Sequence, residues 1–252
     1  MARDPWDWLG WASLPLLGLI WQGAAWAAGS RFLPGPLAVA AHLRFLAQEA
    51  HLYADFGQTL LRAGLGFAIS LGLGCVLGLT LGRVRGLDRL FGPWVVVGMN
   101  LPAIVLAILC YIWLGLTDFA LVLAVVLNKV PLVTATIAQG VRSFDPDYDE
   151  LARAFRMSRG DRLRLIYLPQ LTPHVLTAAR SGLALVWKIV LVFEVLGSDG
   201  GVGFRISLFF QFFDMKGILA YSCAFVALIM ALEYLILRPL EERLLAWQSD
   251  RT

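Results

Sequence analysis

The feature that most limits the possible folds of this 252-residue chain is a series of predominantly apolar runs, most of them close to the ~20 residues that cross a bilayer as a helix. A backbone in hydrocarbon has no water to bond, so a spanning segment must satisfy its own hydrogen bonds, as a helix does. Charged residues make up only 15% of the chain, whereas roughly a quarter is usual in soluble domains. The sequence therefore predicts an all-α integral membrane protein, with one transmembrane domain over residues 1–252. About six spans are expected, at residues 8–28, 57–82, 93–114, 119–140, 173–196 and 217–237.

The first run has two readings. Its AWAAG end at 25–29 resembles a signal-peptidase site, but the length of the run and the acidic Asp4 and Asp7 favour a retained helix. The prolines of SRFLPGP (30–36) then interrupt any helix. Residues 37–50 are expected to form a short amphipathic helix near the membrane interface.

The distribution of positive charge predicts the orientation. Most of the 21 Lys and Arg residues fall in the short loop 83–89, in the segment 142–169 and near the two chain ends. These regions share one side if the N-terminus is inside. Because short cytoplasmic loops carry an excess of Lys and Arg, we expect both termini in the cytoplasm.

Small residues recur every fourth position in the second expected span. At this spacing they lie on one face of a helix, where they let a neighbouring backbone approach closely. We therefore predict a helix-packing face made by Gly66, Ser70, Gly74, Gly78 and Gly82.

The segment 142–169, RSFDPDYDELARAFRMSRGDRLRLIYLP, is polar and lies between two apolar runs. Asp145-Pro146 is typical of a helix start, and Ser158 with Asp161 resembles a second capping pair. The sequence predicts two short helices joined by a turn on the inner face, ended by Pro169. A loop that rests on lipid headgroups is the alternative. The expected apolar stripe is Leu151, Ala154, Phe155 and Met157.

Several polar side chains fall inside the expected spans. Ionisable groups at membrane depth are costly and usually face a partner or a cavity. Lys129 and Lys188 could attract an anionic solute, or one of them could pair with Glu194, and we favour the internal pairing. The whole set is Asn128, Lys129, Gln139, Arg180, Lys188, Glu194 and Glu233.

The order Glu150-x-Ala152-x-Ala154, followed by Ile166-x-Leu168-Pro169, resembles the EAA loop of ABC importer permeases. Arg156 stands where that family has glycine. Because arginine adopts the left-handed conformation only at a cost, we expect a turn of different construction here.

Other stretches extend the resemblance to the nitrate/sulfonate/taurine branch of this family. Two positions depart from it: Asn100 stands where the branch has arginine, and Ile108 where it has a second proline. The matching stretches are LPGPLAV (33–39), Arg62-Ala-Gly-Leu-Gly-Phe, Pro102, Trp113-Leu-Gly115, Trp187 with Glu194, Gly201-Val-Gly203-Phe, and Leu240-Glu-Glu-Arg243 with Trp247.

The resemblance implies a type I ABC importer permease in a bacterial inner membrane, moving a small solute inward by alternating access, with anions favoured. The partners implied are a dimer of cytoplasmic ATP-binding subunits, a second permease copy, a periplasmic or lipid-anchored solute-binding protein and membrane lipid. ATP and Mg²⁺ would bind the ATPase subunit, and this chain would bind no cofactor or metal. The implied coupling residues are Glu150, Leu151, Ala152, Ala154, Phe155, Arg156, Met157, Leu168 and Pro169. The implied translocation-path residues are Asn100, Pro102, Asn128, Lys129, Lys188 and Glu194.

Two other classes of protein remain as alternatives: a self-contained channel or carrier, and an intramembrane enzyme. The sequence contains no phosphate-binding G-x-x-x-x-G-K-[ST] motif, and neither the H-E-x-x-H nor the G-x-S-x-G motif of hydrolases. Its net charge of +3 gives no argument for nucleic acid as a partner.

Overall fold

The computed structural model describes residues 7–48, 50–145, 147–237 and 239. Within these ranges the secondary structure is helical, and no strand occurs. The expected tail at 240–252, including Arg243 and Trp247, lies outside the described residues, as do Asp4 and Pro146. The helices are α1 (Asp7–Ala28), α2 (Pro36–Leu46), α3 (Ala50–Arg83), α4 (Arg85–Asn100), α5 (Ala103–Leu114), α6 (Asp118–Arg142), α7 (Asp147–Ala154), α8 (Arg159–Arg162), a π-helical turn (Leu163–Tyr167), α9 (Leu168–Gly197), α10 (Val202–Gln211), α11 (Met215–Leu232) and a second π-helical turn (Glu233–Leu237).

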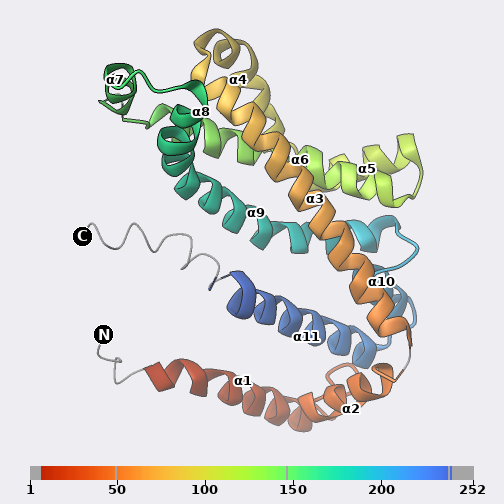
Figure 1. Ribbon diagram of the computed structural model, residues 1–252. Helices are drawn as coiled ribbons and strands as arrows, with labels where there is room; N and C mark the ends of the chain where they lie inside the picture. Colours follow the sequence, from red (N-terminus) through yellow and green to blue (C-terminus); the bar gives the residue numbers. More distant parts are fainter. Residues whose placement is uncertain (1–6, 49, 146, 238, 240–252) are drawn as a thin grey trace.

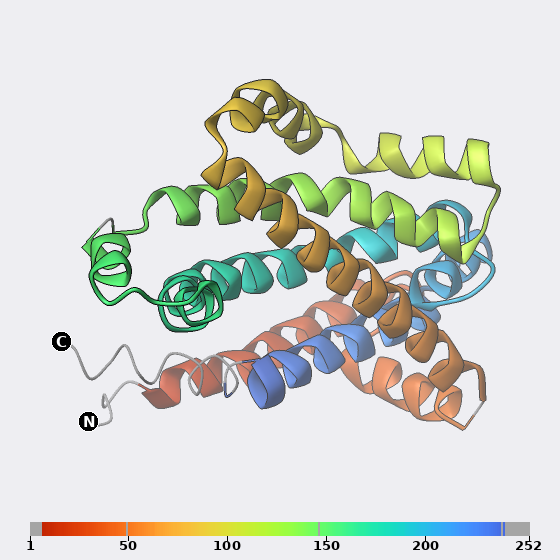
Figure 2. The same cartoon turned by 45° about the horizontal axis from the view of Figure 1, so that its top comes forward.

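Four long helices, α1, α6, α9 and α11, run roughly alongside one another. The helix α3 runs obliquely to them and passes over α6 and α9 (Figures 1 and 2). The helices α7 and α8 lie at one end of this bundle, which we call the α7 end. The α5–α6 and α9–α10 connections lie at the other, which we call the opposite end (Figure 1).

The membrane character of the fold is confirmed, but the number of spans is not. Within the described ranges, four helical stretches are long and apolar enough to cross a bilayer: His51–Arg83, Asp118–Arg142, Gly160–Gly197 and Met215–Leu235. The bent pair α4–α5 would make a fifth. The helix α1 covers the first expected run, and a total of six spans stays a prediction.

The prediction of one continuous third span over 93–114 is wrong. The chain forms α4 and α5 instead, whose axes meet at 95°. Leu101, between them, is extended, with φ −68° and ψ 124°. A residue that precedes proline is disfavoured in the helical conformation. The helix α4 therefore ends at Asn100, two residues before Pro102, and Pro102 is the N-cap of α5.

The prediction that Pro169 ends its helix is also wrong. Pro169 lies in the first turn of α9, and the helical path continues without a break from Arg159 to Gly197. A proline normally removes an i→i−4 hydrogen bond. In the π turn Leu163–Tyr167 the backbone hydrogen bonds join residues five apart instead of four. The hydrogen-bond register of the helix has therefore already changed before Pro169.

The small residues of α3 lie against branched side chains of α6, and this contact, the α3–α6 seam, is the most extensive between any two helices in the described chain. The contacts advance by four residues on each helix: Gly66 faces Val125, Gly74 faces Val133, Gly78 faces Ile137 and Gly82 faces Val141. Ser70 is buried in the same stripe and donates to the carbonyl oxygen of Gly66 at 2.6 Å. By this register, Ser70 and Lys129 occupy the row between Gly66 and Gly74.

We predict that Gly78→Ala lowers stability by about 1–3 kcal/mol, because overpacking forces strain into a tight contact. The added methyl carbon would lie 2.6 Å from Cβ of Ile137 and 2.8 Å from the backbone oxygen of Thr134, which cannot rotate away. Gly72→Ala is the matched control on the same helix, because no atom lies within 4 Å of its added methyl. Thermal midpoints of the purified variants in detergent check this, and equal midpoints for the two would contradict the close packing.

Candidate functional site

The helix α7 carries an exposed apolar row outside the candidate spans. Tyr148, Leu151 and Phe155 follow at i, i+3 and i+7, the spacing of one helix face. Leu151 is 47% exposed and Phe155 74% exposed. Ala152 is only 3% exposed, so the strip of the helix that borders this row is turned into the protein. Tyr148 was absent from the residues expected to couple, although the same spacing rule could have found it.

The start of the second short helix is confirmed as a capping pair. The Ser158 hydroxyl accepts from the backbone N–H of Asp161 at 3.1 Å and donates to its carboxylate at 2.6 Å. At the first short helix, the Asp145 carboxylate accepts from the backbone N–H of Asp147 at 3.0 Å.

The turn after α7 is built as a left-handed turn, so the expectation of a different construction is wrong. Arg156 has a φ of +49°. Its backbone N–H donates to Arg153 O at 3.1 Å, and the N–H of Met157 donates to Ala152 O at 3.0 Å. These two bonds form a Schellman motif, whose left-handed position is usually glycine. Arginine therefore occupies a glycine conformation at this position.

The remaining residues expected to couple differ in exposure. Glu150, Ala154 and Leu168 are exposed, whereas Met157 and Pro169 are half-buried. Ile166, from the same motif, is buried. The segment thus has an outer face that includes Leu151 and Phe155 and an inner face that includes Ala152 and Ile166.

A buried ion pair lies at the opposite end of the bundle. Arg62 of α3 donates to Glu194 of α9 at 2.9 Å, and the two side chains are 3% and 1% exposed. The Glu194 carboxylate also accepts from the Thr59 hydroxyl and from the Gly203 N–H, each at 2.9 Å. The predicted pairing of Glu194 with Lys129 or Lys188 is therefore wrong. The signal for the true partner was Arg62 itself, an arginine inside an apolar run.

Further bonds extend this pair to other elements. Arg62 also donates to Asp118, the first residue of α6, at 2.7 Å and to the Gly200 carbonyl at 2.6 Å. Nearby, Arg205 of α10 donates to Asp55 at 2.8 Å. The hydrogen bond to Asp55 raises the pKa of Arg205 above its ordinary value.

The other residues expected to line a translocation path lie at the α4–α5 break, on α6 and on α9. Asn100 and Pro102 are exposed at the α4–α5 break, and the Asn100 amide donates to Val96 O at 2.8 Å. Lys188 is exposed on α9. Lys129 is only 5% exposed and has no hydrogen bond or ion pair within the described part of the chain, and its neighbour Asn128 is half-buried.

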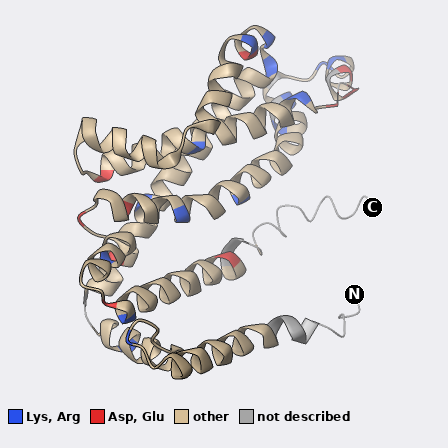
Figure 3. Cartoon of the chain, turned by 180° about the vertical axis from the view of Figure 1, so that it is seen from behind, with Lys and Arg blue, Asp and Glu red and all other residues tan. Residues whose placement is uncertain are grey.

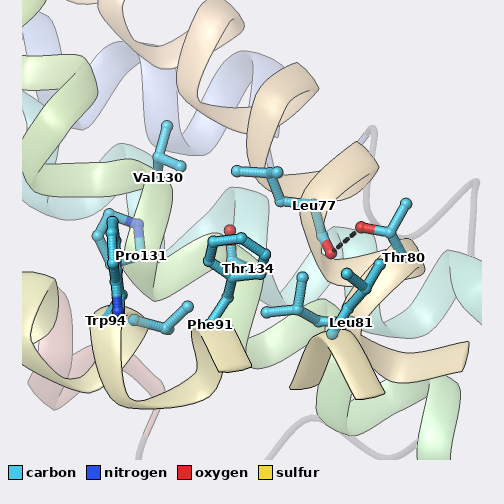
Figure 4. Close-up of a pocket in the computed structure, with 10 residues that line it drawn as sticks. Leu77, Thr80, Leu81, Phe91, Trp94, Val130, Pro131 and Thr134 are labelled. Carbon is cyan, nitrogen blue, oxygen red and sulfur yellow. Dashed lines mark hydrogen bonds between the residues drawn. The ribbon is translucent and has the colours of Figure 1, made fainter. Parts of the chain in front are cut away.

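A groove of about 350 Å³ opens between α3, α4 and α6 (Figure 4). Its lining is almost entirely apolar, and none of the residues expected to bind solute or to couple belongs to it. The Thr80 hydroxyl is bonded within its own helix, to Leu77 O at 2.7 Å (Figure 4). The labelled lining residues are Leu77, Thr80, Leu81, Phe91, Trp94, Val130, Pro131 and Thr134.

Helices of membrane length, joined by buried ion pairs, define a multi-pass membrane protein with an exposed apolar row outside its spans. Residues 53–243 match the family of binding-protein-dependent transport system inner membrane components, and the chain belongs to that family. It is therefore the permease component of an ABC importer for a small solute, and ATP hydrolysis belongs to a separate subunit. The channel, carrier and enzyme alternatives are set aside.

The chain is similar to the putative aliphatic sulfonates transport permease protein SsuC of Bacillus subtilis strain 168, with 26% identity over 99% of this chain and 91% of that protein. It is also 26% identical to the nitrate import permease protein NrtB of Synechococcus elongatus, over 77% of this chain and 73% of that one. The fold resembles a solved amino acid ABC transporter chain, with a TM-score of 0.65 at 18% identity, covering 80% of this chain and 97% of that chain. Type I importer permeases therefore share this fold.

We predict that Arg156→Gly stabilises the permease by about 1 kcal/mol, because a left-handed residue other than glycine costs about that much. The midpoint of thermal unfolding should rise by about 2–4 °C. Arg153→Gly is the contrasting variant, since Arg153 lies inside α7 and glycine there is expected to cost about 1 kcal/mol. A fall in the midpoint for both variants would contradict the turn described above.

Proposed function

We propose that the 142–169 segment docks onto a cytoplasmic ATP-binding subunit and moves with it. The observation that carries this proposal is the exposed row Tyr148, Leu151 and Phe155 on a helix outside the spans. A folded chain gains nothing from exposing such a row to water, and exposed apolar patches commonly mark contact sites.

The surroundings of the row suit a protein partner. Glu150 precedes Leu151 and Arg156 follows Phe155 in the chain, and both charged residues are exposed. An apolar centre with a charged rim is the usual composition of a protein–protein contact, in which a few anchors carry most of the binding energy. Leu151 and Phe155 are the proposed anchors, and the whole set is Glu150, Leu151, Ala152, Ala154, Phe155, Arg156, Met157, Leu168 and Pro169.

The charge distribution supports placing the α7 end in the cytoplasm. Lys and Arg positions gather there, on α4, α7 and α8 (Figure 3). Both chain ends would then be cytoplasmic, in keeping with the positive-inside bias. The opposite end would face the periplasm, where a solute-binding protein would deliver its cargo to a pair of permease copies.

Energy transfer would follow from two packings of the bundle. ATP and Mg²⁺, bound by the partner subunit, would change how that subunit holds α7. A ligand shifts a conformational equilibrium only by its differential affinity for the two states. The docking contact must therefore differ between the inward-open and outward-open forms.

Small organic or inorganic anions are the proposed solutes. Lys129 lies near the middle of α6, is buried, and lacks a counter-charge in the described chain. An anion would supply that charge, and a buried cation without one is costly. The sulfonate and nitrate permeases named above are similar to this chain, which supports the same solute class.

We predict that Phe155→Ala and Leu151→Ala each weaken binding of the ATPase subunit by about 2 kcal/mol, or roughly 30-fold, as removal of an interface anchor does. Leu165→Ala is the control, because Leu165 is also exposed in the segment but lies outside the row. Titration of the ATPase subunit onto the permease in nanodiscs measures the affinity. Equal affinities of the ATPase subunit for all three variants would contradict the proposed contact.

We predict that Lys129→Met lowers anion uptake at least about tenfold, whereas Lys129→Arg, which keeps the charge, retains most of it. The measurement is ATP-dependent uptake of nitrate, sulfate and ethanesulfonate into proteoliposomes that contain the complete transporter. Thermal midpoints of the two variants control for loss of folding. Full uptake by the methionine variant, or uptake of neutral solutes alone by the native complex, would contradict the anion assignment.

A further inference from the structure

The ring of Tyr167 is the meeting point of three elements at the α7 end. The Arg83 guanidinium, at the end of α3, lies 4.1 Å from the ring centroid. The Phe144 ring, just after α6, stacks on it at 5.9 Å with an interplanar angle of 15°. The Arg162 guanidinium, at the end of α8, lies 5.4 Å away. One half-buried ring thus touches groups from α3, from the α6 end and from α8.

The position of Tyr167 in the chain allows this cluster to transmit movement between helices. Tyr167 is the last residue of the π turn that joins α8 to α9 without a break. A displacement of α8 must therefore pass through the backbone of Tyr167 to reach α9. Its ring contacts offer the same displacement a second route, into α3 and α6. Single π turns inside helices are frequent at functional sites.

Other bonds between the 142–169 segment and the bundle are more directional. The Asp145 backbone N–H donates to the Gln170 amide at 3.1 Å, and Ser143 lies 3.4 Å from the His174 ring. Hydrogen bonds weaken steeply when their angle changes. A cation over a ring face, or two stacked rings, remains favourable over a range of offsets.

The ion pair of Arg142 with Asp88 does not provide an alternative route. It joins α6 to α4 and involves no residue of α7, α8 or α9. Both of its side chains are partly exposed, and exposed pairs contribute little. The start of α9 also packs on α3 through the apolar cluster that includes Leu171 and Leu79. The Tyr167 ring adds a contact with the last residue of α3.

We propose that Tyr167 is a positioning residue that transmits the movement of the docked α7–α8 unit to α3, through its ring contact with Arg83. This inference rests on the proposed docking of an ATPase subunit. The ring face carries the effect, and the hydroxyl does not. Removing the ring should leave the docking row intact but reduce the response of the opposite end to ATP.

The test uses the permease assembled with its ATPase subunit in nanodiscs, with Cys75, Cys110 and Cys223 replaced by serine and Phe212→Cys as a reporter. Phe212 is exposed, in the α10–α11 turn at the opposite end. The rate of its labelling by a membrane-impermeant maleimide is measured without nucleotide and after trapping with ATP and vanadate. Co-purification of the ATPase subunit and its ATP hydrolysis are recorded for each variant.

Tyr167→Phe keeps the ring and should respond to ATP like the native permease. In Tyr167→Leu the ATP-dependent change in the labelling rate should be about fivefold smaller, because one or two ring contacts are lost. The ATPase subunit should remain bound to this variant. Arg83→Met, at an exposed position, should reproduce that loss if Tyr167→Leu does not fold, and Arg83→Lys should restore part of the response.

The outcomes separate this inference from the function on which it rests. A full labelling response in Tyr167→Leu and Arg83→Met, with the ATPase subunit bound, would overturn the role of Tyr167 alone. An equal loss in Tyr167→Phe would also overturn it, because the ring would then be insufficient. A native permease that binds no ATPase subunit would overturn both.

Discussion

The close approach of α3 to α6 is the constraint on which the rest of the arrangement depends. Lipid offers no hydrophobic drive for helix association, so two spans must gain their energy from packing at short range. The four-residue repeat of small groups on α3 lets the branched side chains of α6 enter its surface in a fixed register. A shift of one residue along either helix would place a branched side chain against a larger neighbour, so the register is well defined.

Two arginines of α3 lie on either side of this packed face: Arg62, about a third of the way along the helix, and Arg83, its last residue. Arg62 and Arg83 are separated by about 31 Å at the helical rise of 1.5 Å per residue, close to the thickness of the hydrocarbon core. Arg62 binds Glu194 near the end of α9, and Arg83 lies over Tyr167 just before its start. The helices α3 and α9 are thus joined by a cation near each end of α9, with the packed glycine face between. The buried pair alone is weak evidence for stability, because desolvation offsets much of its attraction. Its clearer consequence is to fix which side of α9 faces α3.

How much of this could be read from the sequence depends on how local each signal is. Apolar runs, the glycine repeat and the Ser158–Asp161 cap are local patterns, and each leads directly to a helix, a face or a helix start. The effect of a proline is less local: Pro93, Pro131 and Pro173 lie inside helices, whereas Pro102 separates two. The partner of Glu194 could not be chosen from the sequence, because helix rotation and crossing decide which cation reaches it. At Arg156 tertiary structure overrides the conformational preference of the residue, since the Schellman bonds fix the left-handed turn.

Packing around α4 differs from packing around α3 and α9. No residue of α4 is buried, and two grooves separate it from α3 and α6, of about 350 and 360 Å³. Its contacts with the bundle include Gly98 against Pro131 and the Asp88–Arg142 pair. Segments with few buried contacts are the least costly to displace, whereas α3 and α9 are held at both ends. A rearrangement that leaves the α3–α6 seam intact therefore meets least resistance at α4. If α4 moved relative to α5, the extended backbone of Leu101–Pro102 between them would be the hinge.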